Sequence, residues 1–253
     1  MRRKSMLAVF TIVVATSTIS LSPPAREFGK ITLPLGVVQV RPAGDDEWQR
    51  AKVRHPVFVQ DGVQTQAKSR AEITLTGGGK VRIGENAELI LSEANVAPLK
   101  KDFSANLKKG QIWVSAKAAF GEKKNVAIRT PTAVAAIRGT TYRAVAGEEE
   151  SSILVYEGEV DVNWAQNVQE LRREQVPKGG EGPRFRLGPV EEVKAPEQVA
   201  GPYEVTLEEW ITLVEGMQIN IRKDGKYHMF EFDRGADAEL EWVRWNQELD
   251  AQE

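Results

Sequence analysis

Apolar and polar residues alternate with a period of two through the middle of the chain. The short alternating runs between Ile31 and Val162 are separated by Gly, Asn, Asp and Lys, which is typical of β-strands joined by turns. The alternating pairs are Val38 and Val40, Ile73 and Leu75, Val81 and Ile83, Leu89 and Leu91, Ile112 and Val114, Val126 and Ile128, Ile153 and Val155, and Val160 and Val162. We expect each pair to face one core, with tight turns at residues 77–79 and 84–86. The pattern predicts a mainly β fold.

The pattern changes after residue 164. Residues 165–202 are charged and rich in Pro and Gly, which indicates a linker. Residues 206–216 carry a capping box, an apolar stripe and a terminal Gly, and so predict a short helix. Alternating residues on both sides of Lys223-Asp-Gly225 predict a β-hairpin, and residues 236–249 predict a second helix. Residues 203–253 are therefore expected to form a small α+β appendage, a helix, a hairpin and a helix.

Two tryptophans, Trp242 and Trp245, lie on the last predicted helix. Large aromatic residues on a short helix indicate burial against another surface. One interpretation is that the helix docks onto the chain's own β domain or hairpin. The other is that it binds a partner, because aromatic anchors are common at interfaces. Both residues are therefore candidate partner contacts.

Residues 1–25 have the features of an export signal. Arg2, Arg3 and Lys4 precede an apolar run over residues 6–15, followed by a Ser- and Thr-rich stretch. The run is short for a membrane-spanning helix, so we expect cleavage and no stable transmembrane anchor. The predicted location is the periplasm or the medium, with an uncleaved inner-membrane anchor as the alternative.

Composition removes several classes of function. The chain has no cysteine and only two histidines, which excludes disulfides and argues against a zinc centre. Its 34 basic residues nearly balance its 36 acidic residues, and no basic run with interleaved aromatics suggests nucleic-acid binding. No nucleophile with a base, phosphate loop or paired-carboxylate site stands out. We therefore predict a protein that is not an enzyme and has no cofactor.

Residues 130–142 form a run of small residues around a single long side chain. Pro131 favours an extended Thr130, and Gly139 permits a turn before a strand resumes. Arg138 is either a structural arginine, pairing with carbonyls or with a carboxylate such as Glu85, or a contact for an anionic ligand or partner. It is our third candidate partner contact.

Together with segments upstream and downstream, this run resembles the FecR-type periplasmic domain over about residues 29–164. The residues that carry the resemblance are Ser69, Arg70, Ala71, Glu72, Gly84, Glu85, Asn86, Thr130, Pro131, Thr132, Arg138, Gly139, Thr140 and Gly158. The resemblance implies a β-solenoid-like or twisted β-sandwich domain that is non-catalytic and belongs to the cell envelope. The charges of residues 69–72 are interpreted as pairs across a strand ladder, with ligand contact as the alternative.

The resemblance also implies a protein partner in the envelope. Well-known family members relay the state of a receptor to a sigma factor through a separate cytoplasmic domain. Only five residues precede the apolar run here, so we expect no such domain in this chain and instead a receptor or membrane regulator as partner, in signalling or as a scaffold. Exposed sheet edges could bind an incoming strand of that partner.

Two surface features leave other ligands open. Trp48, Trp113 and Trp164 could stack on sugar rings, which would make the protein a carbohydrate or peptidoglycan binding module, although tryptophans in strands are commonly core residues. Lysines at residues 100–101 and 108–109 could form a positive edge that meets an anionic glycan or lipid surface. They could equally be solvated turn residues.

Overall fold

The computed structural model describes residues 26–116, 122–138, 140–165, 167 and 210–252, and these residues are mainly β-strand. The predicted fold class is thus confirmed. The strands are β1 (Glu27–Leu35), β2 (Val38–Arg41), β3 (Gln49–Arg50), β4 (His55–Phe58), β5 (Gly62–Thr65), β6 (Arg70–Leu75), β7 (Lys80–Ile83), β8 (Glu88–Ala97), β9 (Lys100–Ser115), β10 (Lys123–Arg129), β11 (Ala133–Arg138), β12 (Thr141–Ala146), β13 (Glu150–Glu157), β14 (Glu159–Trp164), β15 (Ile211–Val214), β16 (Met217–Arg222) and β17 (Tyr227–Glu231). Two helices, α2 (Arg234–Ala238) and α3 (Glu241–Asp250), follow them.

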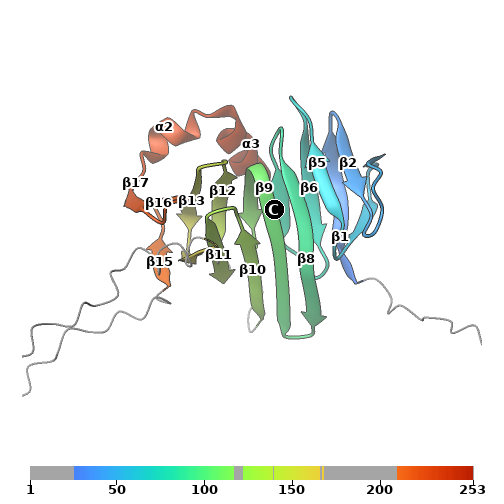
Figure 1. Cartoon of the computed structure of the whole chain (residues 1–253), viewed down its shortest axis with the longest axis horizontal. Helices are drawn as coiled ribbons and strands as arrows, with labels where there is room; N and C mark the ends of the chain where they lie inside the picture. Colours follow the sequence, from blue (N-terminus) through green and yellow to red (C-terminus); the bar gives the residue numbers. More distant parts are fainter. Residues whose placement is uncertain (1–25, 117–121, 139, 166, 168–209, 253) are drawn as a thin grey trace, which may run out of the picture.

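The described strands form one 17-stranded sheet that folds into two layers (Figure 1). We call layer A the series β4-β1-β6-β7-β9-β12-β13-β16-β17. Layer B is the series β3-β2-β5-β8-β9-β10-β11-β14-β15. Only β9 and β10 pair in parallel among these strands. The antiparallel hairpins match the twisted sandwich, because a solenoid stacks its coils in parallel.

Strand β9 belongs to both layers. Its first part pairs with β8 and β10 in layer B, and its last part pairs with β7 and β12 in layer A. The change occurs at Gly110, where φ is +88° and an added Cβ would lie 2.5 Å from the Cβ of Ala87. Only glycine fits this conformation and this close approach.

The core lies between the layers and contains side chains from both. Ile31, Ile73 and Val155 of layer A and Leu89 and Val162 of layer B are fully buried in one continuous cluster. All five follow the period-two pattern of the sequence, since alternate residues of a strand face opposite sides. The pattern therefore identified the core correctly.

The C-terminal part differs from its prediction in two places. The helix expected at residues 206–216 is wrong where the structure describes it, because Ile211–Val214 is strand β15, which pairs with β14. The helix expected at residues 236–249 is split into α2 and α3, since Leu240 between them has an extended backbone. The hairpin around residues 223–225 is confirmed as β16 and β17.

The hairpin is joined to the β domain by strand pairing. β15 continues layer B beside β14, and β16 continues layer A beside β13. The division of the chain at residues 164 and 203 stays a prediction, as does the export signal, which lies outside the described residues. Nearly all of the predicted linker also lies outside them. No described helix is long and apolar enough to cross a membrane.

Candidate functional site

The two C-terminal helices lie on the outer face of layer A (Figure 1), where three arginines bind their carboxylates. We call Arg70, Arg82 and Arg143 the arginine face; they stand on β6, β7 and β12. Arg70 binds Glu241 with two hydrogen bonds, Arg82 binds Asp250, and Arg143 binds Asp237. Each arginine thus has a carboxylate partner from α2 or α3.

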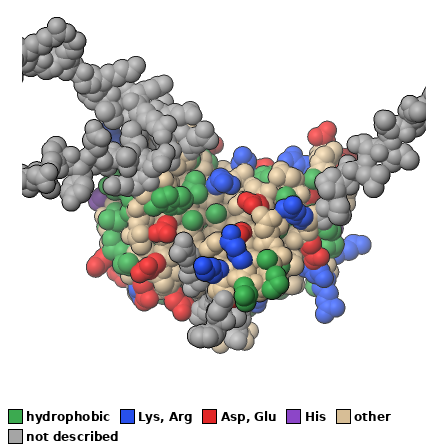
Figure 2. Space-filling view, turned by 90° about the horizontal axis from the view of Figure 1, so that it is seen from below, with side chains coloured by type: hydrophobic (Ala, Val, Ile, Leu, Met, Phe, Trp, Pro, Cys, Tyr) green, Lys and Arg blue, Asp and Glu red, His purple; other side chains and the backbone are tan. Residues whose placement is uncertain are grey.

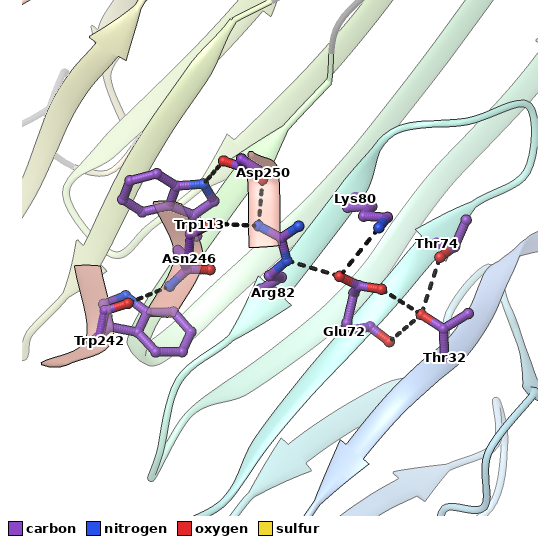
Figure 3. Close-up of polar contacts among 9 residues, drawn as sticks. All are labelled: Thr32, Glu72, Thr74, Lys80, Arg82, Trp113, Trp242, Asn246 and Asp250. Atoms are coloured by element: carbon purple, nitrogen blue, oxygen red, sulfur yellow. Dashed lines mark hydrogen bonds and ion pairs between the residues drawn. The ribbon is translucent and has the colours of Figure 1, made fainter. Parts of the chain in front are cut away.

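Arg82 is the centre of this contact (Figure 3), and its side chain is fully buried. Its Nε donates to Glu72 at 2.8 Å, and its Nη1 donates to Asp250 at 2.5 Å and to the backbone carbonyl of Asn246 at 3.3 Å. Glu72 stands directly opposite Arg82 across the β6–β7 ladder. A buried guanidinium needs such partners, because removing it from water is costly.

Glu72 is held in its charged form. Burial alone raises the pKa of this carboxyl, but hydrogen bonds from Arg82 and Thr32 and the charge of Lys80 outweigh burial and lower it. The Thr32 hydroxyl donates at 2.7 Å, and the Lys80 ammonium lies 3.6 Å away. Glu72 therefore pairs with a charge across the strand ladder, as the sequence suggested for residues 69–72. Arg70 instead binds Glu241 of α3.

Aromatic side chains fill the space between the arginines. Trp113 is buried, donates its indole N–H to Asp250 at 2.9 Å and packs on Tyr156 with ring centroids 4.3 Å apart. Trp242 is also buried, and Trp245 stacks on it while Arg70 lies over both rings. The two C-terminal tryptophans thus lie as expected for a helix that docks onto the chain's own β domain. Contact with a partner stays a prediction, and the burial of Trp242 argues against it.

A second polar contact fixes α2. Arg143 donates to Asp237 at 2.6 Å, and the Tyr156 hydroxyl donates to the other carboxylate oxygen at 2.5 Å. Burial, followed by the nearby Asp237, keeps the pKa of Tyr156 well above its ordinary value, although the charge of Arg143 opposes the shift. Tyr156 therefore stays a neutral donor.

The upstream family residues close a turn between the layers. Ser69 is buried, accepts from the N–H of Val37 and donates to the carbonyl of Ala67. Glu85 accepts from the N–H of Lys68 at 2.7 Å. Three other family residues complete the turn. Ala71 is buried in the core, the N–H of Gly84 donates to the carbonyl of Gln111, and Asn86 has a φ of +53°. These positions shape the backbone.

The downstream family residues do the same. The Thr130 hydroxyl accepts from the N–H of Ala133 across the bend at Pro131, and the Thr132 hydroxyl donates to the carbonyl of Ile221 in layer A. Thr140 donates to the carbonyl of Glu159, and an added Cβ on Gly158 would lie 2.3 Å from Thr140. The backbone of Arg138 ends β11 opposite Asn125. Its side chain and all of Gly139 lie outside the description, so its role stays open.

The three tryptophans proposed for sugar stacking do not form an exposed platform. Trp113 and Trp164 are buried, and Trp164 donates to the carbonyl of Gly225 and packs against Tyr227. Trp48 is half-buried with Arg41 over its ring. The stacking surface that the carbohydrate hypothesis requires is therefore not formed by these residues.

The edges of the layers differ in how they are protected. Edge strand β4 contains Pro56, and edge strand β3 is only two residues long. β17 has five residues, no Pro or Gly, and pairs only with β16 among the described strands. The fourth edge strand, β15, has four residues and likewise contains no Pro or Gly, so β17 is the longest of the four edge strands.

Sequence reasoning missed the arginine face. Arg82, Arg143, Asp237 and Asp250 were not among the candidate residues. The turn at residues 77–79 carries a usable signal, because a hairpin centred there places Glu72 opposite Arg82. No local pattern indicates Asp250, which lies 168 residues from Arg82. Among the described residues, no cluster of three or more His, Asp or Glu could hold a metal ion.

Comparisons with known proteins agree with the sequence resemblance. Residues 61–161 match the family model described as FecR protein. The chain therefore contains a FecR-type domain, which spans β5 to β13 and part of β14.

Crystal structures at 1.65 Å and 2.50 Å of a candidate anti-sigma factor from Parabacteroides distasonis also match, with a TM-score of 0.43 and 14% identity. Each match covers 68% of this chain and 60% of that chain, less than two thirds of its length. A comparison with curated proteins found no match.

Proposed function

We propose that this protein is a non-enzymatic envelope protein that binds an extended segment of another envelope protein, a receptor or membrane regulator, in signalling or as a scaffold. The FecR-type domain at residues 61–161 supports the envelope role. The observation that carries the binding mode is the open edge strand β17. An incoming segment would pair with β17 and lengthen layer A by one strand.

The exposed side chains of β17 favour this mode. Tyr227 and Met229 stand opposite Ile221 and Ile219 of β16, so they belong to the face that carries the core. Yet Tyr227 is 48% and Met229 43% exposed, whereas both isoleucines are fully buried. The core face is thus open at this edge, and an added strand would cover it.

The backbone of β17 has free donors on its outer side. The hydrogen bonds from Arg222 N–H to Lys226 and from Phe232 N–H to Gly216 mark the bonded pairs of the hairpin. Because bonded and non-bonded pairs alternate in an antiparallel ladder, His228 and Phe230 point their N–H groups at β16. Met229 therefore points its N–H away from β16, where an added strand would accept it.

Crosslinking in intact cells tests this mode of binding. A photoreactive phenylalanine analogue at Tyr227 is expected to capture one envelope protein reproducibly. The same analogue at Leu240, which is 49% exposed but lies between the helices, serves as the control and should not capture it.

Substitution of Met229 separates backbone pairing from side-chain contact. In the chain that carries the probe, Met229→Pro removes the outward donor together with the Met side chain and should abolish capture. Met229→Ala removes the side chain but keeps the donor, and should retain capture. Both variants should keep the melting temperature nearly unchanged. Capture that survives Met229→Pro, or no capture at Tyr227, would refute strand addition.

A further inference from the structure

A second surface lies on the outer face of layer B, which points away from the core. In the ladder of this layer, Ala136 of β11 stands between Ala127 of β10 and Asp161 of β14. All three alternate along their strands with buried core residues, so their side chains stand on the outer face. Because an alanine side chain ends at its Cβ, a flat ligand can lie close to the sheet at Ala127 and Ala136.

A hollow of about 480 Å³ opens at Ala136 on this face, and Trp210 forms part of its wall. The volume lies within the roughly 300–1,000 Å³ that is typical of small-molecule sites. The other five tryptophans of the chain each pack on an aromatic ring or lie under an arginine, whereas Trp210 has no such partner among the described residues. Trp210 is also 49% exposed, so its indole is open to a ligand in the hollow.

Two polar side chains of the hollow, Asp161 and Asn125, have free acceptor atoms. One carboxylate oxygen of Asp161 accepts from the Thr212 hydroxyl at 2.8 Å, and the other accepts nothing from the described residues. Asn125 donates to Asp102 at 2.7 Å, and Asp102 is neutralised by Lys100 at 3.0 Å. The amide oxygen of Asn125 also accepts no hydrogen bond within the described part of the chain. These acceptors match the hydroxyl groups of a sugar.

The lining of the hollow favours a neutral ligand over a cation. Sites for organic cations surround the charge with several aromatic faces, whereas Trp210 is the one aromatic residue and Asp161 the one charged residue among the described residues that line this hollow. The backbone of Arg138 stands opposite Asn125, but its side chain lies outside the description and is no part of the proposed site. Figure 2, a view from below, shows acidic and basic side chains side by side near the β8–β9 turn, where β10 begins. Such mixed signs give no long-range attraction to a strongly charged ligand.

We propose that Trp210, Asp161 and Asn125 bind a neutral β-1,4-linked glycan. One sugar ring stacks on Trp210 above Ala136, and its hydroxyl groups donate to Asp161 and Asn125. The rings of a β-1,4-linked chain present flat C–H faces, which fit a single indole plane and a floor of alanine. The inference is independent of strand addition, because the hollow lies on the outer face of layer B and β17 is an edge strand of layer A.

Isothermal titration calorimetry of the purified protein tests the proposal with three probes. The neutral probe is the β-1,4-linked tetramer of N-acetylglucosamine. The glucosamine tetramer has the same linkage but carries amines in place of the acetylated groups, and choline is a cation without a sugar ring. We expect the neutral tetramer to bind, and to bind more tightly than either cation. No binding of the neutral tetramer, or binding of a cationic probe that is equally tight or tighter, would overturn the proposal.

Matched variants locate the site. Trp210→Leu should weaken binding of the neutral tetramer about tenfold, whereas Trp210→Tyr keeps a ring and should retain most of it. Asp161→Asn removes the charge at nearly constant size and should weaken binding about fivefold. Ala136→Leu fills the hollow while both wall residues remain, and should weaken binding as well.

Tyr227→Leu is the control, because Tyr227 is an aromatic residue of matching exposure, 48%, on β17. It should leave binding of the tetramer unchanged. The proposal fails if this control loses binding as Trp210→Leu does. It also fails if the variants of the hollow bind like the parent while their melting temperatures show that they are folded.

Discussion

The C-terminal segment contains two adjacent regions that meet the β layers in opposite ways. On the arginine face, α2 and α3 cover Arg82 and Arg143, which are buried, and each guanidinium has a carboxylate partner. On β17, a few residues earlier, Tyr227 and Met229 leave apolar surface in water and the outer backbone unpaired. The charged groups of the first region are paired within the chain, whereas Tyr227 stays half exposed although it packs against Trp164. We therefore propose that the helices stabilise the fold and that β17 binds a partner.

The largest expected effect separates the two regions. Arg82→Ala would leave Glu72 and Asp250 without their buried partner, so we expect a loss of about 3–5 kcal/mol in the free energy of unfolding. Urea denaturation measures it. Under conditions where the variant is still folded, crosslinking at Tyr227 should persist. A loss below about 1 kcal/mol would show that the network contributes little.

Acid should act on the same network. The pKa of Glu72 is lower in the folded chain than its ordinary value of 4.5, so the folded state holds its proton less tightly than the unfolded state. The stability from this carboxylate is therefore complete above about pH 4.5 and is lost as the pH falls through the lower folded value. Unfolding of Glu72→Gln and of the parent across this range gives the check. The difference between them should shrink in acid, and a constant difference would contradict the assignment.

The smallest expected effect is at the exposed end of the arginine face. Glu241 is 62% exposed on its side chain, so Arg70→Ala should cost only up to about 1 kcal/mol, including the loss of its contact with Trp242 and Trp245. The same denaturation assay applies, with and without added salt. The loss should diminish in high salt, and a loss as large as that of Arg82→Ala would remove the distinction between buried and exposed pairs.

The strands could be predicted because their information is local. Period-two alternation identified the core, and the Gly-containing turns at residues 77–79 and 223–225 set two hairpins correctly. The helix expected at residues 206–216 failed because its capping and stripe signals are also local, whereas Leu213 is buried and Val214 exposed as a strand beside β14. Tertiary pairing overrode helix propensity there.

The site was harder to predict than the fold. Arg70 and Glu72 were singled out by a family resemblance, but their partners Glu241 and Arg82 were not. The resemblance marked residues such as Ser69 and Thr132, whose hydrogen bonds shape turns and crossings. Contacts over such long sequence separations leave no periodic trace, so the sequence alone does not reveal which charges meet.

The arginine face also has a consequence for the order of synthesis. Arg70 and Arg82 lie on β6 and β7, which are synthesised early. Their partners Glu241 and Asp250 are synthesised after every described strand. Emerging hairpins can pair with their neighbours as the chain lengthens, but this contact must wait until the ribosome has passed Asp250. Until then no helix covers Arg82. The outer face of layer A in an incomplete chain therefore exposes a charged side chain that is buried in the complete chain.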